Sequence, residues 1–141
     1  MRIFLSTFGI VLVDQLIKQL VLRWFDLPFW LIDQQLGLQV VFNRGVAFSL
    51  PVTGFMSILV SSAVISGLLY YYLKFTKRTS LADCTFALIL GGALGNFLDR
   101  LHSGAVIDYV HIFSYPAFNV ADIAITVGFL IFVFRFDNIR I

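Results

Sequence analysis

The stretch GGALGNFLDR (residues 91–100), together with IDY (107–109) and FNVAD (118–122), decides how this chain is organised. These stretches place three aspartates, two asparagines and an arginine at or beside the ends of two long apolar runs. An unpaired charge in such a place costs on the order of several kcal/mol. A lone acid there is usually the structural partner of a nearby base, whereas several carboxylates at one depth indicate chemistry or ion handling.

The composition is that of a membrane protein. The 141 residues are 60% apolar and 13% charged, with a mean hydropathy of +0.93, whereas soluble domains average roughly 45–50% apolar and about 25% charged. We therefore expect one polytopic membrane domain over residues 1–141. The net charge of +2 is too small and too scattered to indicate nucleic-acid binding. The single Cys84 excludes an intrachain disulfide.

Four apolar runs predict four membrane-spanning helices, at about residues 3–24, 54–73, 81–101 and 120–136. The short loop after the second run contains Lys74, Lys77 and Arg78, and basic short loops stay in the cytoplasm. We therefore expect this loop and both chain termini to be cytoplasmic. The two longer connections then lie on the outer side.

The first apolar run begins like a secretory signal peptide, but Asp14, Gln15 and Lys18 interrupt it and apolar residues then resume. This pattern predicts an uncleaved first helix. Asp14 and Lys18 are four residues apart, so they share one helix face and can neutralise each other. We interpret them as a structural ion pair that ties the first helix to the bundle, with a direct role in chemistry as the alternative.

The first outer connection breaks the helical periodicity, and Leu36–Phe42 alternates well enough to predict a short half-buried strand. Asn43-x-Gly45 then predicts a tight turn. Several aromatic residues suit the membrane interface, namely Phe25, Phe29, Trp30, Phe42 and Phe48. The predicted fold is an all-α membrane protein, a four-transmembrane-helix bundle with a small extramembrane β element in the first outer loop.

The third apolar run contains small residues and then ends in polar ones. Gly91 and Gly95 allow a neighbouring helix to approach closely. Asn96 and Arg100 share one face of this helix. Packing does not explain these polar residues, although Asp99 balanced by Arg100 as a structural charge pair remains an alternative.

The fourth apolar run starts after Asn119, a favourable N-cap, and Asp122 lies in its first turn, where an anion meets the positive end of the helix. A pure capping role for Asn119 is the alternative to a functional one. Asp108 precedes this run in the second outer connection, which we interpret as a loop.

Two close carboxylates can hydrolyse a peptide bond by sharing one proton, because the ionised group activates water while the other donates a proton. His102, His111 and Cys84 form no recognisable metal-ligand pattern, and no serine or zinc protease motif is present.

Three blocks resemble those of the bacterial lipoprotein signal peptidase family, also called signal peptidase II. They are Phe42-Asn43-x-Gly45-x-Ala47-Phe48-Ser49, Gly91-Gly92-x-x-Gly95-Asn96-x-x-Asp99-Arg100 and Phe118-Asn119-x-Ala121-Asp122, with Asp14-Gln15-x-x-Lys18 as a weaker fourth. The order, spacing and four-span layout also fit this family. Two positions depart from its pattern: Tyr109 stands where the family usually has Phe, and Arg44 where a small or neutral residue is more common.

The resemblance implies an intramembrane aspartyl endopeptidase that removes the signal peptide from prolipoproteins on the N-terminal side of the diacylglyceryl-modified cysteine. The family's catalytic pair corresponds to Asp108 and Asp122. Because Asp122 lies at a helix N-terminus, we expect it to be the ionised base of this pair and Asp108 to be the proton donor. Its supporting polar residues correspond to Asp14, Asn43, Gly45, Asn96, Arg100 and Asn119. We expect no cofactor and no metal.

The expected partners are lipid-modified prolipoproteins and membrane lipids, with no nucleic acid. We expect a monomer in the bacterial cytoplasmic (inner) membrane, with the active site toward the outer side. Substrate should enter sideways from the bilayer, with Phe42 and Phe48 helping to hold its acyl chains. The alternatives are a small ion- or proton-coupled transporter, a non-catalytic membrane scaffold, and a catalytically silent relative of the peptidase.

Overall fold

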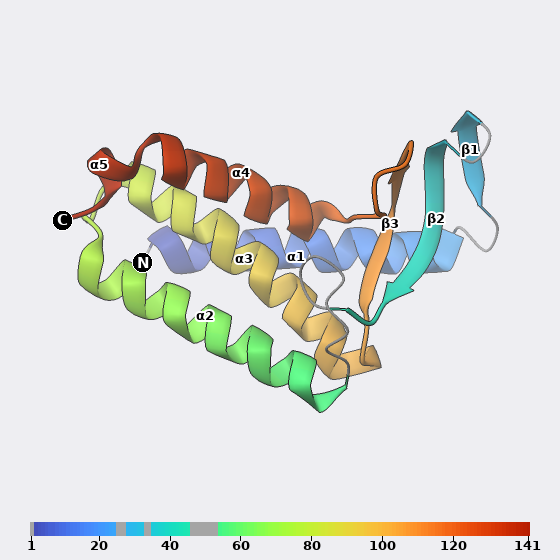
Figure 1. Ribbon diagram of the computed structural model, residues 1–141, viewed down its shortest axis with the longest axis horizontal. Coiled ribbons are helices and arrows are strands. Elements are labelled where there is room, and N and C mark those ends of the chain that lie inside the picture. The colour runs from blue at the N-terminus through green and yellow to red at the C-terminus, as the bar shows by residue number, and fades with distance from the viewer. Residues whose placement is uncertain (1, 25–27, 33–34, 46–53) are drawn as a thin grey trace.

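The computed structural model describes residues 2–24, 28–32, 35–45 and 54–141, so the expectations for Phe25 and Phe48 lie outside the described residues. The elements in chain order are α1 (Arg2–Trp24), β1 (Phe29–Ile32), β2 (Leu36–Asn43), α2 (Phe55–Phe75), α3 (Ser80–Ser103), β3 (Val106–Ile112), α4 (Val120–Phe134) and α5 (Phe136–Ile139). The long helices run side by side, and the strands gather at the end of the molecule opposite both termini (Figure 1).

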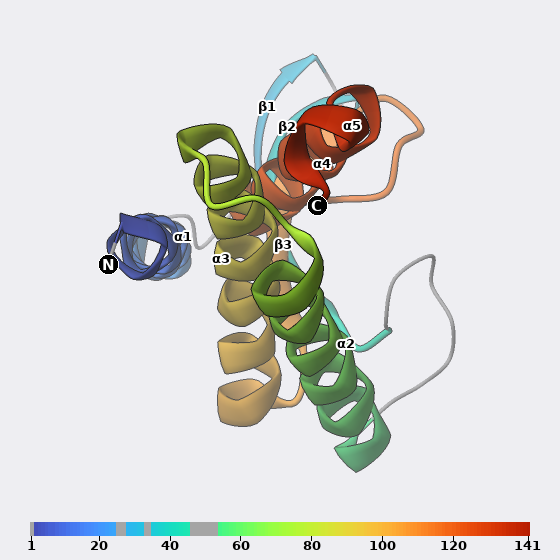
Figure 2. The ribbon, with the colours of Figure 1, turned by 90° about the vertical axis from the view of Figure 1, so that its left-hand side faces the viewer.

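Among the described residues, the helices long and apolar enough to cross a membrane are α1, α2 and α3, whereas α4 is apolar but has only 15 residues. The predicted run 120–136 is divided because Arg135 leaves the helical conformation, with φ −119° and ψ 19°, before the short α5 begins. Helix α3 lies at the centre and contacts α1, α2 and α4 (Figure 2). The polar residues of its outer end can therefore meet partners from several helices.

Glycines on α3 allow this close contact, as the sequence predicted. Gly91 faces Ile10 of α1, and Gly92 faces the backbone of Ala121 on α4. Gly95 faces the carboxylate of Asp14 on α1. A side chain at any of these positions would need the space that the neighbouring helix occupies.

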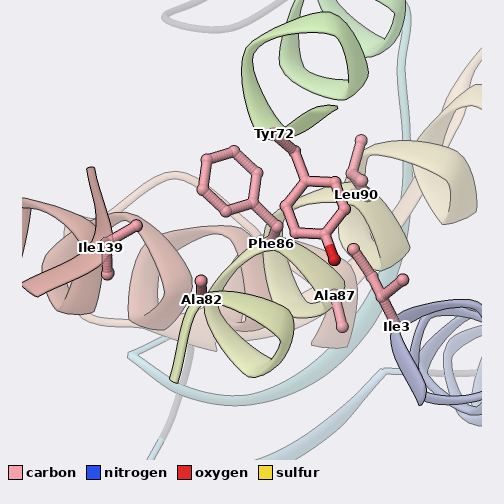
Figure 3. Close-up of a cluster of buried hydrophobic side chains, with 7 residues drawn as sticks. All are labelled: Ile3, Tyr72, Ala82, Phe86, Ala87, Leu90 and Ile139. Carbon is pink, nitrogen blue, oxygen red and sulfur yellow. The ribbon is translucent and has the colours of Figure 1, made fainter. Parts of the chain in front are cut away.

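The end of the bundle near the termini has an apolar core. Tyr72 from α2 packs around Phe86 of α3, and Ile139 of α5 is fully buried against this cluster (Figure 3). Backbone pairing holds the C-terminal residues in place, since Thr76 and Arg140 form a β-bridge and the N–H of Ile141 donates to Phe75. The C-terminal segment therefore fastens α4 to the turn between α2 and α3.

The outer end has an antiparallel sheet with the strand order β1-β2-β3 in the described residues. The strand predicted at Leu36–Phe42 is present as β2. We predicted a loop between the third and fourth apolar runs, and this prediction is wrong, because the connection contains β3. Asp108 on β3 is paired with Val41 on β2. The prediction failed because strand pairing across more than 60 residues leaves no local periodicity to detect.

We expect Gly92→Ala to lower the midpoint of thermal unfolding in detergent. The added methyl group would overlap the backbone oxygen of Ala121 and the side chain of Ile125, so α3 and α4 must separate, at a cost of about 1–3 kcal/mol. Gly9→Ala on α1 is the matched control, because outside the α1 backbone no atom of the described residues lies within 4 Å of its new methyl group. Equal midpoints for the two variants would contradict close α3–α4 contact at Gly92.

Candidate active site

Asp108 projects from β3 and is only 2% exposed. Its Oδ2 accepts a hydrogen bond of 2.9 Å from the Nδ2 of Asn43, which ends the neighbouring strand β2. Its Oδ1 accepts one of 2.7 Å from the Nδ2 of Asn119, which precedes α4. The pairing of β3 with β2 therefore places Asp108 beside the N-terminus of α4.

Asp122 lies in the first turn of α4 and forms a capping box with Asn119. The backbone N–H of Asp122 donates to Asn119 Oδ1 at 2.9 Å, and Asp122 Oδ2 accepts from the Asn119 backbone at 3.1 Å. The Nδ2 of Asn96 on α3 donates to Asp122 Oδ1 at 2.8 Å. Both carboxylate oxygens thus have donors beside the positive end of a helix.

Asn119 connects the two acids. Its Nδ2 donates to Asp108, while its Oδ1 accepts from the backbone of Asp122. The same Nδ2 also lies 3.1 Å from Asn96 Oδ1 and 3.3 Å from the carbonyl oxygen of Ile107. Asn119 is therefore an N-cap, as predicted, and also a bridge between both aspartates, so the pure capping alternative is incomplete.

Both aspartates line a cavity of about 430 Å³, a size typical of ligand sites. Its polar end is formed by Asn43, Gly45, Asn96, Arg100, Asp108 and Asp122. Its apolar wall comes from α2 and α4 and includes Val64, Ile65 and Ile125. The cavity therefore joins a pair of carboxylates to an apolar surface between two helices.

Arg100 completes the polar end from α3. Its Nη2 donates to the carbonyl oxygen of Gly45 at 3.0 Å, and its Nη1 to that of Asn96 at 3.2 Å. The Gly45 N–H donates to Asn43 Oδ1 at 3.0 Å, which confirms the predicted turn. Within the part of the chain that the structure describes, the buried Nε of Arg100 has no hydrogen-bond partner.

Comparison with known families assigns the chain to one of them. The family described as Signal peptidase (SPase) II matches residues 6–137. The chain belongs to the signal peptidase II family. Proteins named lipoprotein signal peptidase from Halalkalibacterium halodurans and Halothermothrix orenii are 41% and 36% identical to it over 126 and 129 residues. These alignments cover 84% and 89% of this chain, and 81% and 88% of the two relatives.

Solved structures show the same fold. A bacterial membrane enzyme matches with a TM-score of 0.81 at 25% identity, covering 95% of this chain and 91% of that chain. A second bacterial membrane enzyme matches with a TM-score of 0.82 at 24% identity, covering 96% and 87%. The helices and sheet of this signal peptidase II family member are thus arranged as in solved membrane enzymes.

In this signal peptidase II family member, polar side chains of α1 contact the residues that surround the site. The predicted pair is confirmed, with Lys18 Nζ 2.8 Å from Asp14 Oδ2 and both side chains fully buried. Asp14 Oδ1 also accepts from the backbone N–H of Ala121 at 3.0 Å, in the first turn of α4. Asp14 therefore contacts the first turn of α4 as well as Lys18, and it is not among the residues that line the cavity.

Asp99 has a structural role, as the alternative that balanced it with Arg100 held, but its ion pair is with Lys18, while Arg100 interacts with Asp99 only as a nearby charge. Asp99 Oδ2 lies 2.7 Å from Lys18 Nζ and accepts from the Ile107 backbone at 3.2 Å, while its Oδ1 accepts from Gln15. Sequence reasoning considered Arg100 because it is the neighbour of Asp99 in the sequence. Adjacent residues on a helix point in different directions, however, and Asp99 points toward Lys18 of α1. The spacing does contain a signal, since Asp99 lies three residues after Asn96 and four after Gly95, on the side that approaches α1.

Burial raises the pKa of Asp108 to about 6, and the nearby charge of Asp122 acts in the same direction. The hydrogen bonds from Asn43 and Asn119 oppose this shift. Burial likewise raises the pKa of Tyr109 to about 12, and its hydroxyl has no hydrogen-bond partner among the described residues. Asp108 and Asp122 therefore differ in environment, which suits an acid–base pair.

The described residues contain no group of three His, Cys, Asp or Glu side chains placed to hold a metal.

The raised pKa of Asp108 has a measurable effect on stability. The folded protein keeps this proton up to about pH 6, whereas the unfolded chain loses it near 3.8, so stability falls as the pH rises between these values. We expect the unfolding midpoint of Asp108→Asn to fall less steeply than that of the wild type from about pH 4 to about pH 6.5.

The control for this measurement is Asp137→Asn, whose side chain is 82% exposed. This variant should keep the wild-type slope, because the carboxylate that it removes is exposed and its ion pair with exposed Arg140 contributes little to stability. The same slope in Asp108→Asn and the wild type would show that burial does not raise the pKa of Asp108.

Proposed function

We propose that this chain is an intramembrane aspartyl endopeptidase that removes the signal peptide from lipid-modified prolipoproteins, on the N-terminal side of the diacylglyceryl-modified cysteine. The observation that carries the proposal is the pair Asp108 and Asp122, which Asn119 bridges at the polar end of a cavity with apolar walls. Membership of the signal peptidase II family supports the reaction, and relatives carry the name lipoprotein signal peptidase.

The proposed mechanism uses both acids at once. Ionised Asp122 takes a proton from a water molecule, whose oxygen forms a bond to the carbonyl carbon of the scissile peptide. Protonated Asp108 donates its proton to the carbonyl oxygen. When the tetrahedral intermediate collapses, the carbon–nitrogen bond breaks and the leaving amine takes up the proton that Asp122 received. One hydroxyl of the intermediate returns its proton to Asp108 as the new carbonyl forms, so both acids regain their starting states.

The environments of the two acids support this assignment. Asp122 accepts hydrogen bonds from Asn96 and from the Asn119 backbone at the N-terminus of α4, which favours its charged form. Asp108 is buried, which favours its protonated form. Arg100 and Asn43 supply further donors at the polar end, where a substrate backbone would need partners.

In the proposed topology all four long helices cross the membrane, both termini are cytoplasmic and the site faces the outer side. The separation of the sheet from both termini supports this orientation (Figure 1). The basic residues Lys74, Lys77 and Arg78 lie at the end near the termini, in keeping with the positive-inside rule. A single domain that acts as a monomer remains our expectation.

Substrate would enter sideways from the bilayer between α2 and α4. A second cavity of about 320 Å³ lies there, lined by apolar residues that include Gly67, Leu68 and Phe129. Ile125 lines both this cavity and the one with the aspartates, so the two are adjacent. The apolar segment of a signal peptide could lie along this path while the scissile bond reaches the acids. Phe42 of β2, which precedes Asn43, is 56% exposed and available to acyl chains.

The decisive experiment is cleavage of a purified lipid-modified prolipoprotein by the wild type, Asp108→Asn and Asp122→Asn. Each substitution removes a carboxyl group with little change in shape, so we expect turnover to fall by at least about 100-fold while an uncleaved substrate analogue still binds. Asp137→Asn, with its exposed side chain far from the cavity, is the control and should cleave normally.

Other outcomes separate the alternatives. Near-normal cleavage by either variant would defeat the two-aspartate mechanism. A wild type that binds the analogue without cutting it would be a catalytically silent relative. A wild type that moves ions and neither binds nor cuts would favour the transporter.

The path between α2 and α4 can be tested with Gly67→Leu. Among the described residues, no atom outside the α2 backbone lies within 4 Å of a methyl group placed at Gly67, so a leucine there can extend into the second cavity. We expect KM for the prolipoprotein to rise at least about fivefold with kcat little changed, because binding and not chemistry is obstructed. Gly9→Leu on α1 has similar free space away from this cavity and is the control. Equal KM values for the two variants would exclude this path.

A further inference from the structure

Lys18 of α1 is fully buried, is not among the residues that line the cavity, and donates a hydrogen bond to one that is, Asn96. Its Nζ lies 2.8 Å from Asp14 Oδ2, 2.7 Å from Asp99 Oδ2 and 3.1 Å from Asn96 Oδ1. An ammonium group has three N–H donors and no acceptor. Each donor of Lys18 therefore has an acceptor, and the proposed mechanism makes no use of this cation.

The contact between Lys18 and Asn96 determines which way the Asn96 amide points. Lysine can only donate, so the amide oxygen must face Nζ and the amide nitrogen must face away from it. Asn119 Nδ2 donates to the same oxygen at 3.1 Å and reinforces this orientation. The Asn96 nitrogen consequently donates to Asp122 Oδ1 at 2.8 Å.

We infer that Lys18 is a positioning residue that acts through Asn96: it holds the amide N–H toward Asp122 and thereby keeps Asp122 the ionised member of the pair. This inference rests on the proposed function. Without Lys18 the Asn96 amide could rotate and present its oxygen to Asp122, an arrangement that only a protonated Asp122 would accept. The buried cation therefore decides which acid is the base.

The other charged and titratable groups near Asp122 come from three elements. They are Asp108 and Tyr109 on β3, Arg100 on α3 and Asp14 on α1. The described α2 residues that line the cavity carry no charge. The Asn119 amide, which also faces Asp122, is oriented independently, because its oxygen accepts from the Asp122 backbone. Asn96 is thus the donor to Asp122 whose direction depends on Lys18.

The test is the pH profile of kcat/KM for prolipoprotein cleavage, measured on the double variant Lys18→Met, Asp99→Asn. This pair of changes removes one positive and one negative charge, so the buried cluster keeps its net charge. We expect the acid limb of the profile to move to higher pH by about one unit, which is a loss of about tenfold in kcat/KM at pH values below the limb. The position of the limb does not depend on how much of the sample is folded.

Asp99→Asn alone is the matched control. It weakens the same cluster but leaves Lys18 in place against Asn96, so it should lower the unfolding midpoint and leave the acid limb where it is in the wild type. A limb that moves equally in the control and in the double variant would overturn the inference, because the shift would then follow from the loss of Asp99.

Asn96→Asp tests the second half of the contact without touching Lys18. The carboxylate keeps an oxygen for Lys18 and Asn119 but has no N–H for Asp122, so this variant should fold and its acid limb should also move to higher pH. An unmoved limb in Asn96→Asp would overturn the inference even if the double variant failed to fold. Absence of cleavage by the wild type would instead contradict the proposed function, so the two failures are distinguishable.

Discussion

A buried cation on α1 constrains the polar half of this molecule. Lys18 is surrounded by Asp14, Asp99 and Asn96, and removing one partner of such a buried group typically costs about 3–5 kcal/mol. The cluster joins α1 to α3 directly, and Asp14 extends it to α4 through the backbone of Ala121. All these buried polar groups have hydrogen-bond or ion-pair partners in the observed arrangement of the helices. The same arrangement brings Asn96 to Asp122.

Close helix contact makes this network possible. Gly92 and Gly95 have no side chains that would hold α3 away from α4 and α1. Short side chains such as those of asparagine and aspartate can therefore reach across the interfaces. The opposite end of the bundle is held by aromatic and aliphatic packing around Phe86 (Figure 3). One end is therefore fastened by apolar contacts, while the other carries polar groups that serve a site.

Local features of the site could be read from the sequence because their partners lie within a few residues. The capping box of Asn119 and Asp122 spans three positions, and the pair of Asp14 and Lys18 spans four. The strand β2 was recognisable by its alternation. The ion pair between Asp99 and Lys18 and the strand that carries Asp108 were missed, because both depend on residues far away along the chain.

The sequence by itself determined that this is a membrane protein, where its apolar helices run, and which acids and amides are too costly to leave unpaired in an apolar setting. The tertiary structure alone decided that Asn43, Asn96 and Asn119 converge on the two aspartates from separate elements. The physical reason is distance along the chain. Asn43 and Asp108 are 65 residues apart, and their meeting depends on strand pairing and helix packing that satisfy buried polar groups together, which no local pattern encodes.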